Sequence, residues 1–311
     1  MNQIKSWLDA IGYDYLKIEV ASSDASFRSY YRIFTQSGTS ILMDSSLEKS
    51  SLVHFLKIQQ RLLNARVRVP QVFESSLELG FVLLEDFGST HLLDILDEEN
   101  QKLYYKKAID EIVQIQQADA TGLLVYDREF LIFEMDLSIE WYLKKHLGVV
   151  LDSKAKVELQ SLFGLIADDV LLQPQGVFVH RDFHSRNIML DANGKLGVID
   201  FQDARSGAIT YDLVSLLKDC YYEIGLEARE ELVLYFRDKK GLDADDKTIL
   251  RWFDMMGLQR HIKILGIFTR LCYRDKKRQY LQDIPLTLRY IKEVALKYPA
   301  LKALDKLLMV N

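Results

Sequence analysis

One segment of the chain has residue types and a spacing suited to phosphoryl transfer: His180-Arg181-Asp182-Phe183-His184-Ser185-Arg186-Asn187. In an H-R-D-x4-N loop, the aspartate accepts the proton of the hydroxyl that attacks the phosphate. Asn187 and Asp200, the latter after the strand-like Val198-Ile199, offer the oxygen ligands that Mg²⁺ prefers. The sequence therefore predicts Asp182 as the base and Asn187 and Asp200 as metal ligands.

Two other interpretations of this segment compete with that chemistry. Aspartate, asparagine and histidine also stabilise loops by local hydrogen bonds. A zinc site could use His180, Asp182 and His184, but no further nitrogen or sulfur ligand lies within reach in the sequence. The coincidence of all the motif's parts at fixed spacing favours phosphoryl transfer.

Composition limits the remaining possibilities. The chain has 311 residues, of which 49% are hydrophobic and 27% charged, which excludes intrinsic disorder as its main state. Its net charge of −5 gives no basic field for nucleic acid. The two cysteines, Cys220 and Cys272, form no C-x-x-C pair, which excludes a disulfide framework and suits a reducing compartment. Short apolar runs and no signal-peptide core predict a cytoplasmic protein with no membrane or nucleic-acid partner, as a monomer or weak dimer.

Hydrophobic periodicity predicts a small mixed lobe followed by a mainly helical one. The first lobe should contain a short helix at 3–11, a hairpin at 27–34 and 40–43, a helix from 52 to before Pro70, and strands at 72–74 and 81–84. Helices are expected at 103–117, 138–147, 157–171, 211–222, 227–239, 246–271 (one or two) and 286–298. A β-rich island at 177–201 contains the turn signal Asp191-Ala192-Asn193-Gly194. We expect domains at 1–87, for nucleotide binding, and 88–311, for the catalytic loop and the acceptor site.

The catalytic segment resembles the aminoglycoside-phosphotransferase-like branch of the protein-kinase-like superfamily, whose members phosphorylate small molecules. Further stretches resemble the bacterial N-acetylmuramate/N-acetylglucosamine anomeric kinases, which phosphorylate the C1 hydroxyl: residues 23–32, 84–88, 134–142, 199–204, 257–263 and 274–281. The resemblance covers nearly the whole chain. It implies an α+β, two-lobed protein-kinase-like fold with a small N-terminal β-rich lobe and a larger helical C-terminal lobe. It also implies ATP and Mg²⁺ as cofactors.

The resemblance also assigns residues outside the catalytic loop. Glu85, Asp86 and Phe87 would form the hinge whose backbone meets adenine, and Ser26 and Phe27 would lie near the nucleotide. Asp212 would brace the catalytic loop, although a plain helix N-cap is an equally good interpretation of this residue. His180 and Asp203 are expected to give structural support.

The chain departs from protein kinases where the ATP phosphates should bind. Residues 22–32 contain no glycine, and the strand Ser40-Ile41-Leu42-Met43-Asp44 has no lysine. Alternation places Arg28 and Arg32 on one face, so we hypothesise that one or both replace the missing charge. The alternative is that they are solvated strand arginines.

The acceptor site should face Asp182 from the helical lobe. Glu134, Asp136 and Trp141 suit sugar hydroxyls and the apolar face of a pyranose. His184 is a further substrate candidate, and a cation would favour the lactyl carboxylate of N-acetylmuramate: Arg181, Arg260, His261 or Arg274. The alternatives are a kinase of an aminoglycoside, choline or a sugar amine, or a nucleotide-binding module without turnover.

Overall fold

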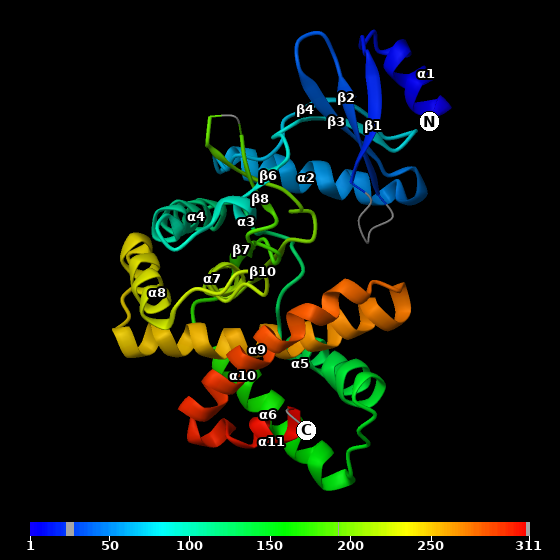
Figure 1. Ribbon diagram of the computed structural model, residues 1–311. Coiled ribbons are helices and arrows are strands. Elements are labelled where there is room, and N and C mark those ends of the chain that lie inside the picture. The colour runs from blue at the N-terminus through cyan, green and yellow to red at the C-terminus, as the bar shows by residue number, and fades with distance from the viewer. Residues whose placement is uncertain (23–27, 192, 309–311) are drawn as a thin grey trace. The chain divides into compact units, whose positions relative to one another are not determined.

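The computed structural model describes residues 1–22, 28–191 and 193–308 (Figure 1). They form two compact units: unit 1 comprises Met1–His91 and Ile188–Gln202, and unit 2 comprises Leu92–Asn187 and Asp203–Asn311. The division of the chain into folding domains at residue 87 stays a prediction.

A five-stranded antiparallel sheet dominates unit 1, with the order β1-β2-β3-β5-β4. Its strands are β1 (Lys17–Ser22), β2 (Ser29–Phe34), β3 (Thr39–Asp44), β4 (Val72–Ser76) and β5 (Phe81–Glu85). The predicted hairpin is confirmed as β2 and β3, which pair from Ser29↔Asp44 to Phe34↔Thr39. The edge strand β1 was not expected from the sequence.

Two helices and a small second sheet complete unit 1. The helix α1 (Asn2–Ala10) contributes Ile4, Trp7 and Leu8 to a buried cluster with Ile33, Leu42, Phe81 and Leu83. The helix α2 (Ser50–Asn64) follows the short η1 (Ser46–Glu48). The strands β6 (Thr90–His91), β8 (Ile188–Leu190) and β9 (Leu196–Val198) form a three-stranded sheet. Pairing of β8 with β9 confirms the hairpin expected around the turn signal within the island at 177–201.

Unit 2 is mainly helical. Its helices are α3 (Leu92–Ile95), α4 (Gln101–Ile115), α5 (Arg128–Leu137), the π-helical η2 (Ser138–His146), α6 (Ser153–Val170), α7 (Tyr211–Leu217), α8 (Leu226–Lys240), α9 (Asp246–Asp275), η3 (Arg278–Asp283), α10 (Ile284–Lys297), η4 (Pro299–Leu301) and α11 (Ala303–Leu308). The sequence did not predict α5, and α7 is shorter than expected.

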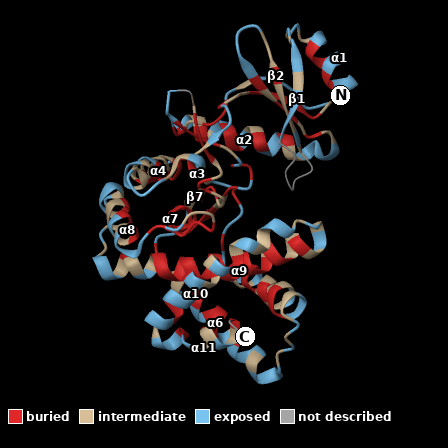
Figure 2. Cartoon of the chain, viewed as in Figure 1, coloured by how far each residue is buried: buried red, intermediate tan, exposed pale blue. Residues whose placement is uncertain are grey.

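The long helix α9 is one continuous element that packs on several others. It contacts α5, η2, α6, α7, α8 and α10. Gly266 permits the closest approach, because a Cβ there would lie 2.4 Å from the carbonyl carbon of Leu137. Figure 2 shows the buried residues along α7 and α9, and every residue of α7 is buried. These two helices therefore form a rigid support within unit 2.

The catalytic segment begins where β7 (Val177–Val179) ends. This strand pairs antiparallel with β10 (Arg205–Gly207), which the sequence did not predict. Among the described residues, no helix is both long enough and apolar enough to cross a membrane.

Candidate active site

Asp212, in the first turn of α7, holds the start of the catalytic loop. Its Oδ2 accepts a hydrogen bond from the His180 amide at 2.8 Å, and its Oδ1 accepts one from the Arg181 amide at 3.0 Å. Arg181 has a φ of 80°, a conformation that is strained for a residue with a side chain. The Ser215 hydroxyl donates to the Arg181 carbonyl at 3.0 Å. The contacts of this side chain fit the bracing interpretation better than a plain N-cap.

A second buried carboxylate, Asp219, holds the other half of the loop. Its Oδ2 accepts hydrogen bonds from the Ser185 amide at 2.9 Å and from the Ser185 hydroxyl at 2.5 Å. Asn187 donates from its side-chain nitrogen to the Asp182 carbonyl at 2.9 Å. These contacts hold the backbone on both sides of Asp182.

The Arg181 side chain enters a buried polar network behind the loop. Its Nε donates to the Tyr126 hydroxyl at 2.7 Å, and its Nη2 donates to Glu134 Oε1 at 3.2 Å. Its Nη1 lies 3.5 Å from the carbonyl oxygen of Asp203, so Asp203 supports the loop through its backbone. Gln259 donates to Glu134 Oε2 at 3.2 Å. Glu134 is therefore occupied by protein groups.

Lys263 of α9 closes this network. Its Nζ donates to the Tyr211 hydroxyl at 2.7 Å and lies 3.4 Å from Glu134 Oε1. The Tyr126 hydroxyl donates to the Tyr211 hydroxyl at 3.1 Å. The Glu134, Lys263, Tyr126 and Tyr211 side chains are buried, and the network joins charged and hydroxyl groups from separate elements. It connects Arg181 to the rigid α7 and α9.

The charge of Asp182 is controlled by its cationic neighbours. Burial raises the pKa of its carboxyl, but Lys263, Arg181, His184 and Arg260 outweigh burial and lower the pKa below its usual value. Asp182 is therefore ionised at neutral pH. An ionised carboxylate can accept a hydrogen bond from a substrate hydroxyl and orient its oxygen.

The acceptor residues predicted from the sequence have different surroundings. Glu134 belongs to the network behind the loop. Asp136 accepts a hydrogen bond from Gln160 of α6 at 2.5 Å, and burial raises its pKa. Trp141 lies half-buried in η2. No recorded contact brings Asp136 or Trp141 to Asp182 within the part of the chain that the structure describes, and their roles stay predictions.

The cationic and imidazole side chains predicted to bind the substrate lie in different surroundings. His184 packs edge-on against Tyr221, with ring centroids 5.2 Å apart, and Arg186 lies over the same ring at 3.6 Å. Arg260 is buried in α9 and lies in electrostatic range of Asp182. Among the described residues, no group of three or more His, Cys, Asp or Glu side chains is placed to hold a metal ion.

In unit 1, two of the predicted hinge residues, Glu85 and Asp86, form ion pairs with arginines. Arg32 contacts Asp86 through two hydrogen bonds, Nε to Oδ2 at 2.7 Å and Nη2 to Oδ1 at 3.2 Å. The same Nη2 donates to the Gly88 carbonyl at 2.7 Å. Arg68 bridges Glu85 and Asp191, at 3.0 Å from each. A role of Arg32 at the ATP phosphates stays a prediction, and its guanidinium is bound to Asp86 and to the Gly88 carbonyl.

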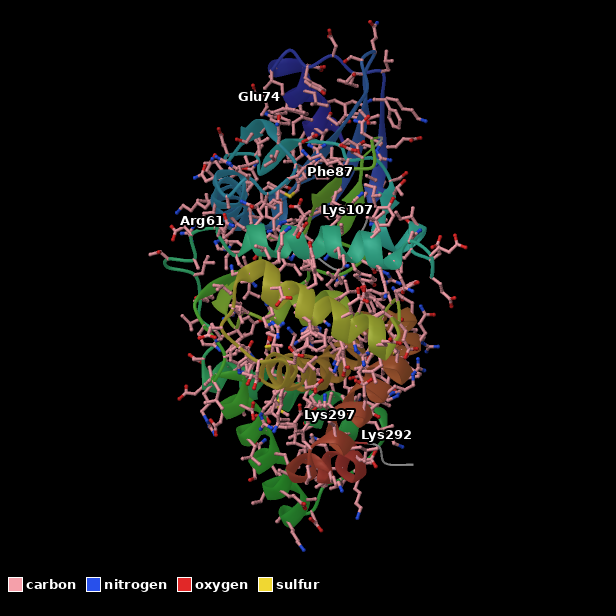
Figure 3. The ribbon with its side chains drawn as sticks, turned by 90° about the vertical axis from the view of Figure 1, so that its left-hand side faces the viewer. Arg61, Glu74, Phe87, Lys107, Lys292 and Lys297 are labelled. Atoms are coloured by element: carbon pink, nitrogen blue, oxygen red, sulfur yellow. The ribbon has the colours of Figure 1, made fainter. Side chains whose placement is uncertain are left out.

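Phe87, which is labelled in Figure 3, belongs to the interior of unit 1. Its side chain is buried, and the Arg68 guanidinium lies 4.6 Å from its ring centroid. A Cβ on Gly197 of β9 would lie 2.3 Å from the ring, so glycine is required at that position. Ser26 and Phe27 lie outside the described residues, and Arg28 follows them half-buried.

Asp200 lies in unit 1 after β9, whereas Asn187 lies in unit 2. Asp200 has a φ of 62°, and its Oδ1 accepts a hydrogen bond from Gln202 at 2.8 Å. The nitrogen of the Asn187 amide is bound to the Asp182 carbonyl, so its oxygen is the atom suited to a cation. Both residues thus supply the oxygen donors that Mg²⁺ prefers. Their metal roles stay predictions.

The Arg32–Asp86 pair can be tested with matched variants. Arg32→Ala and Asp86→Asn should each lower the unfolding free energy by about 1–2 kcal/mol, because each removes the same charge-assisted contact. The double variant should lose little more than either single variant. We expect Arg32→Ala and Asp86→Asn to have the same KM for ATP as each other. If only Arg32→Ala raises it, Arg32 contacts the phosphates as the sequence hypothesis states.

Sequence reasoning missed Tyr126, Tyr211, Lys263 and Asp219. The only local signal was the position of Lys263, which stands three residues after Arg260 and so shares its helix face. The other members of the network lie in distant segments, and nothing in their neighbourhoods distinguishes them from core residues.

Comparison with known sequences identifies relatives along the whole chain. Residues 17–250 match the phosphotransferase enzyme family. An N-acetylmuramate/N-acetylglucosamine kinase of Neisseria meningitidis serogroup B is 39% identical over 99% of this chain and 94% of that protein. The kinase of the same name from Pseudomonas aeruginosa is 38% identical over 93% of this chain and 86% of that protein.

Comparison with solved structures confirms the expected fold. A choline/ethanolamine kinase family protein from Mesorhizobium loti has a TM-score of 0.67 at 13% identity and covers 99% of both chains. An ADP-bound aminoglycoside phosphotransferase has a TM-score of 0.65 at 16% identity, covering 94% of this chain and 98% of that one. The α+β protein-kinase-like architecture, with a small β-rich part and a larger helical part, is therefore confirmed.

Proposed function

The chain belongs to the phosphotransferase enzyme family, and on that premise we propose that it phosphorylates the anomeric C1 hydroxyl of N-acetylmuramate and N-acetylglucosamine. The phosphate donor is ATP, used with Mg²⁺. The catalytic loop with an ionised Asp182 carries this proposal, because an ionised carboxylate at this position can accept the proton of an acceptor hydroxyl. The two kinases at 38–39% identity support the choice of acceptor.

In the proposed reaction, Asp182 accepts a hydrogen bond from the C1 hydroxyl and holds its oxygen in line with the terminal phosphorus of ATP. The new P–O bond to the sugar forms as the bond to the leaving ADP oxygen breaks, and Asp182 takes the hydroxyl proton. Asn187 and Asp200 would hold Mg²⁺, which neutralises charge on the phosphates when bound. Asp212 and Asp219 keep the loop backbone fixed during this transfer.

The acceptor and the phosphorylated position are tested together. The purified chain is incubated with ATP, MgCl₂ and one acceptor at a time, and ADP release is followed: N-acetylmuramate, N-acetylglucosamine, the methyl glycoside of N-acetylglucosamine, an aminoglycoside and choline. Both free sugars should react, with a C1 phosphate visible by NMR, and the methyl glycoside should not. Phosphorylation of the glycoside would place the reaction at another hydroxyl. Turnover of choline or the aminoglycoside alone would replace the proposed acceptor.

The metal assignment predicts a dependence on Mg²⁺. EDTA should stop the reaction, and excess MgCl₂ should restore it. Asn187→Ala should raise the MgCl₂ concentration needed for half-maximal activity by on the order of tenfold, because one oxygen ligand is lost. Asn64→Ala, an exposed change at the end of α2, is the matched control. An unchanged MgCl₂ requirement in Asn187→Ala would remove this residue from the metal site.

A further inference from the structure

Arg260 in the middle of α9 is a buried cation whose contacts are incomplete. The residue is only 4% exposed, and no described residue accepts a hydrogen bond from its buried Nη1. Buried guanidinium groups are normally paired, because an unpaired buried charge is costly. The position therefore calls for an anionic or strongly polar partner.

The acids near Arg260 do not supply that partner. Asp182 and Asp219 lie in electrostatic range, but no ion pair joins Arg260 to an acid within residues 1–22, 28–191 and 193–308. Asp219 accepts hydrogen bonds from Ser185 and from the Tyr221 amide. Asp182 is the group that meets the acceptor hydroxyl. Arg260 thus lies within electrostatic range of Asp182, and its Nη1 has no hydrogen-bond partner among the described residues.

The other cations suggested by the sequence are already engaged or neutral. Arg181 is bound to Glu134 and to the Tyr126 hydroxyl. His261 is buried, its Nε2 lies 3.0 Å from the Lys218 carbonyl, and burial lowers its pKa to about 3, so the ring is neutral. Arg274 is exposed.

Arg274 and Lys263 are also bound to other protein groups. Arg274 donates to both carboxylate oxygens of Asp275 at 2.8 and 2.9 Å. Lys263, the neighbour of Arg260 on α9, is bound to Tyr211 and Glu134. Of these candidates, Arg260 alone combines burial, range of Asp182 and a nitrogen without a partner among the described residues.

We propose that Arg260 binds the lactyl carboxylate of N-acetylmuramate and sets the preference of the enzyme for this sugar over N-acetylglucosamine. The inference rests on the proposed function. The two sugars share the C1 hydroxyl and the 2-acetamido group, and they differ in the lactyl ether on O3. A planar guanidinium pairs with a carboxylate through two hydrogen bonds, which gives both strength and geometric specificity.

The test compares three acceptors that differ only at this substituent: N-acetylmuramate, its lactyl methyl ester and N-acetylglucosamine. In Arg260→Gln, kcat/KM for N-acetylmuramate should fall on the order of 10- to 100-fold, mainly through KM, since a charged hydrogen bond is lost. The ester and N-acetylglucosamine should lose much less, so the advantage of the acid over the ester disappears. Arg260→Lys should recover part of that advantage. Arg274→Gln, which removes an exposed cation, should leave it intact.

Each other outcome has a distinct meaning. Equal losses for all three acceptors in Arg260→Gln would overturn the inference, because Arg260 would then support the loop, and the proposed function would stand. A wild-type enzyme that phosphorylates none of them would end the proposed function and this inference with it. If Arg260→Gln does not fold by circular dichroism, the wild type and Arg260→Lys decide. Equal kcat/KM values of the wild type for N-acetylmuramate and its methyl ester would show that no cation binds the lactyl carboxylate.

Discussion

Replacing Asp182 by asparagine is expected to lower kcat by about a thousandfold, within the range that positioned general bases contribute. Asparagine keeps the size of the side chain but cannot take the hydroxyl proton. The loop should keep its shape, because the contacts of residue 182 with Asn187 and His184 are made by its backbone carbonyl. The loss should therefore appear in turnover and not in ATP binding.

This variant also changes the charge balance of the site. The cations that lower the pKa of Asp182 are Lys263, Arg181, His184 and Arg260. A lowered pKa means that the ionised carboxylate stabilises the folded state above the unfolded pKa near 4, and that this stabilisation is lost as pH falls through the folded pKa. Asp182→Asn lacks the stabilisation at every pH, so its melting temperature at pH 7 should be somewhat lower.

The measurements separate chemistry from folding. Turnover is followed by ADP release, ATP affinity by calorimetry and folding by thermal denaturation. Asp168→Asn is the control, since this carboxylate is exposed on α6 and paired with Arg128 outside the catalytic loop. A variant of Asp182 that kept more than about a tenth of the wild-type kcat would show that another group positions the acceptor.

Local patterns were sufficient to predict the elements that bury one face. The helices α2, α8 and α10 and the hairpin β8–β9 follow hydrophobic periodicity and a turn signal, and both are properties of neighbouring residues. The strand β10 has the sequence Arg205-Ser206-Gly207, which shows no alternation. It is a strand because its backbone pairs with β7, and such pairing leaves no local trace.

The predicted end of α7 shows how a side chain can override a pattern. Apolar residues continue the helical spacing to Tyr222, but the helix ends at Leu217. Asp219 accepts a hydrogen bond from the Tyr221 amide at 3.0 Å and turns its other oxygen to Ser185. The chain leaves the helix because the carboxylate satisfies backbone amides better there than a further turn would.

The catalytic loop was predictable because its chemistry is confined to eight consecutive residues. Apart from Asp212 and the backbone of Asp203, the residues that hold it in place were not. Tyr126, Glu134 and Lys263 come from separate segments and meet only after α5, α7 and α9 have packed. The sequence also assigned Glu134 to the substrate, whereas three protein groups occupy its carboxylate, because a carboxylate in a sequence does not reveal its partners.

Asp212→Asn is expected to destabilise the fold by about 2–4 kcal/mol and to lower kcat by about 10- to 100-fold. The carboxylate accepts two backbone amides with two oxygens, whereas asparagine offers one oxygen and turns an NH₂ group toward the second amide. The unsatisfied amide would be that of His180 or Arg181, so the strained Arg181 backbone would lose its support. Urea denaturation and the turnover assay measure the two effects.

The pH dependence of that stability difference has a definite sign. Burial raises the pKa of Asp212 to about 6, although His180 and the two amide hydrogen bonds act in the opposite direction. The pKa of Asp212 is higher in the folded protein than in the unfolded chain. Its contribution to the unfolding free energy is therefore fully present below about pH 4 and is lost as pH rises through about 6. The loss amounts to about 3 kcal/mol. Asparagine does not ionise and escapes this cost.

The stability gap between wild type and Asp212→Asn should therefore widen on acidification from pH 7 to pH 4.5. The control Asp168→Asn should behave in the opposite way, because hydrogen bonding to Arg128 lowers the pKa of Asp168 and its contribution is lost in acid. Common effects of pH on the rest of the protein cancel in each difference. A gap for Asp212→Asn that narrowed in acid would mean that the loop amides hold this carboxylate ionised despite its burial, and that its pKa in the folded protein is lowered.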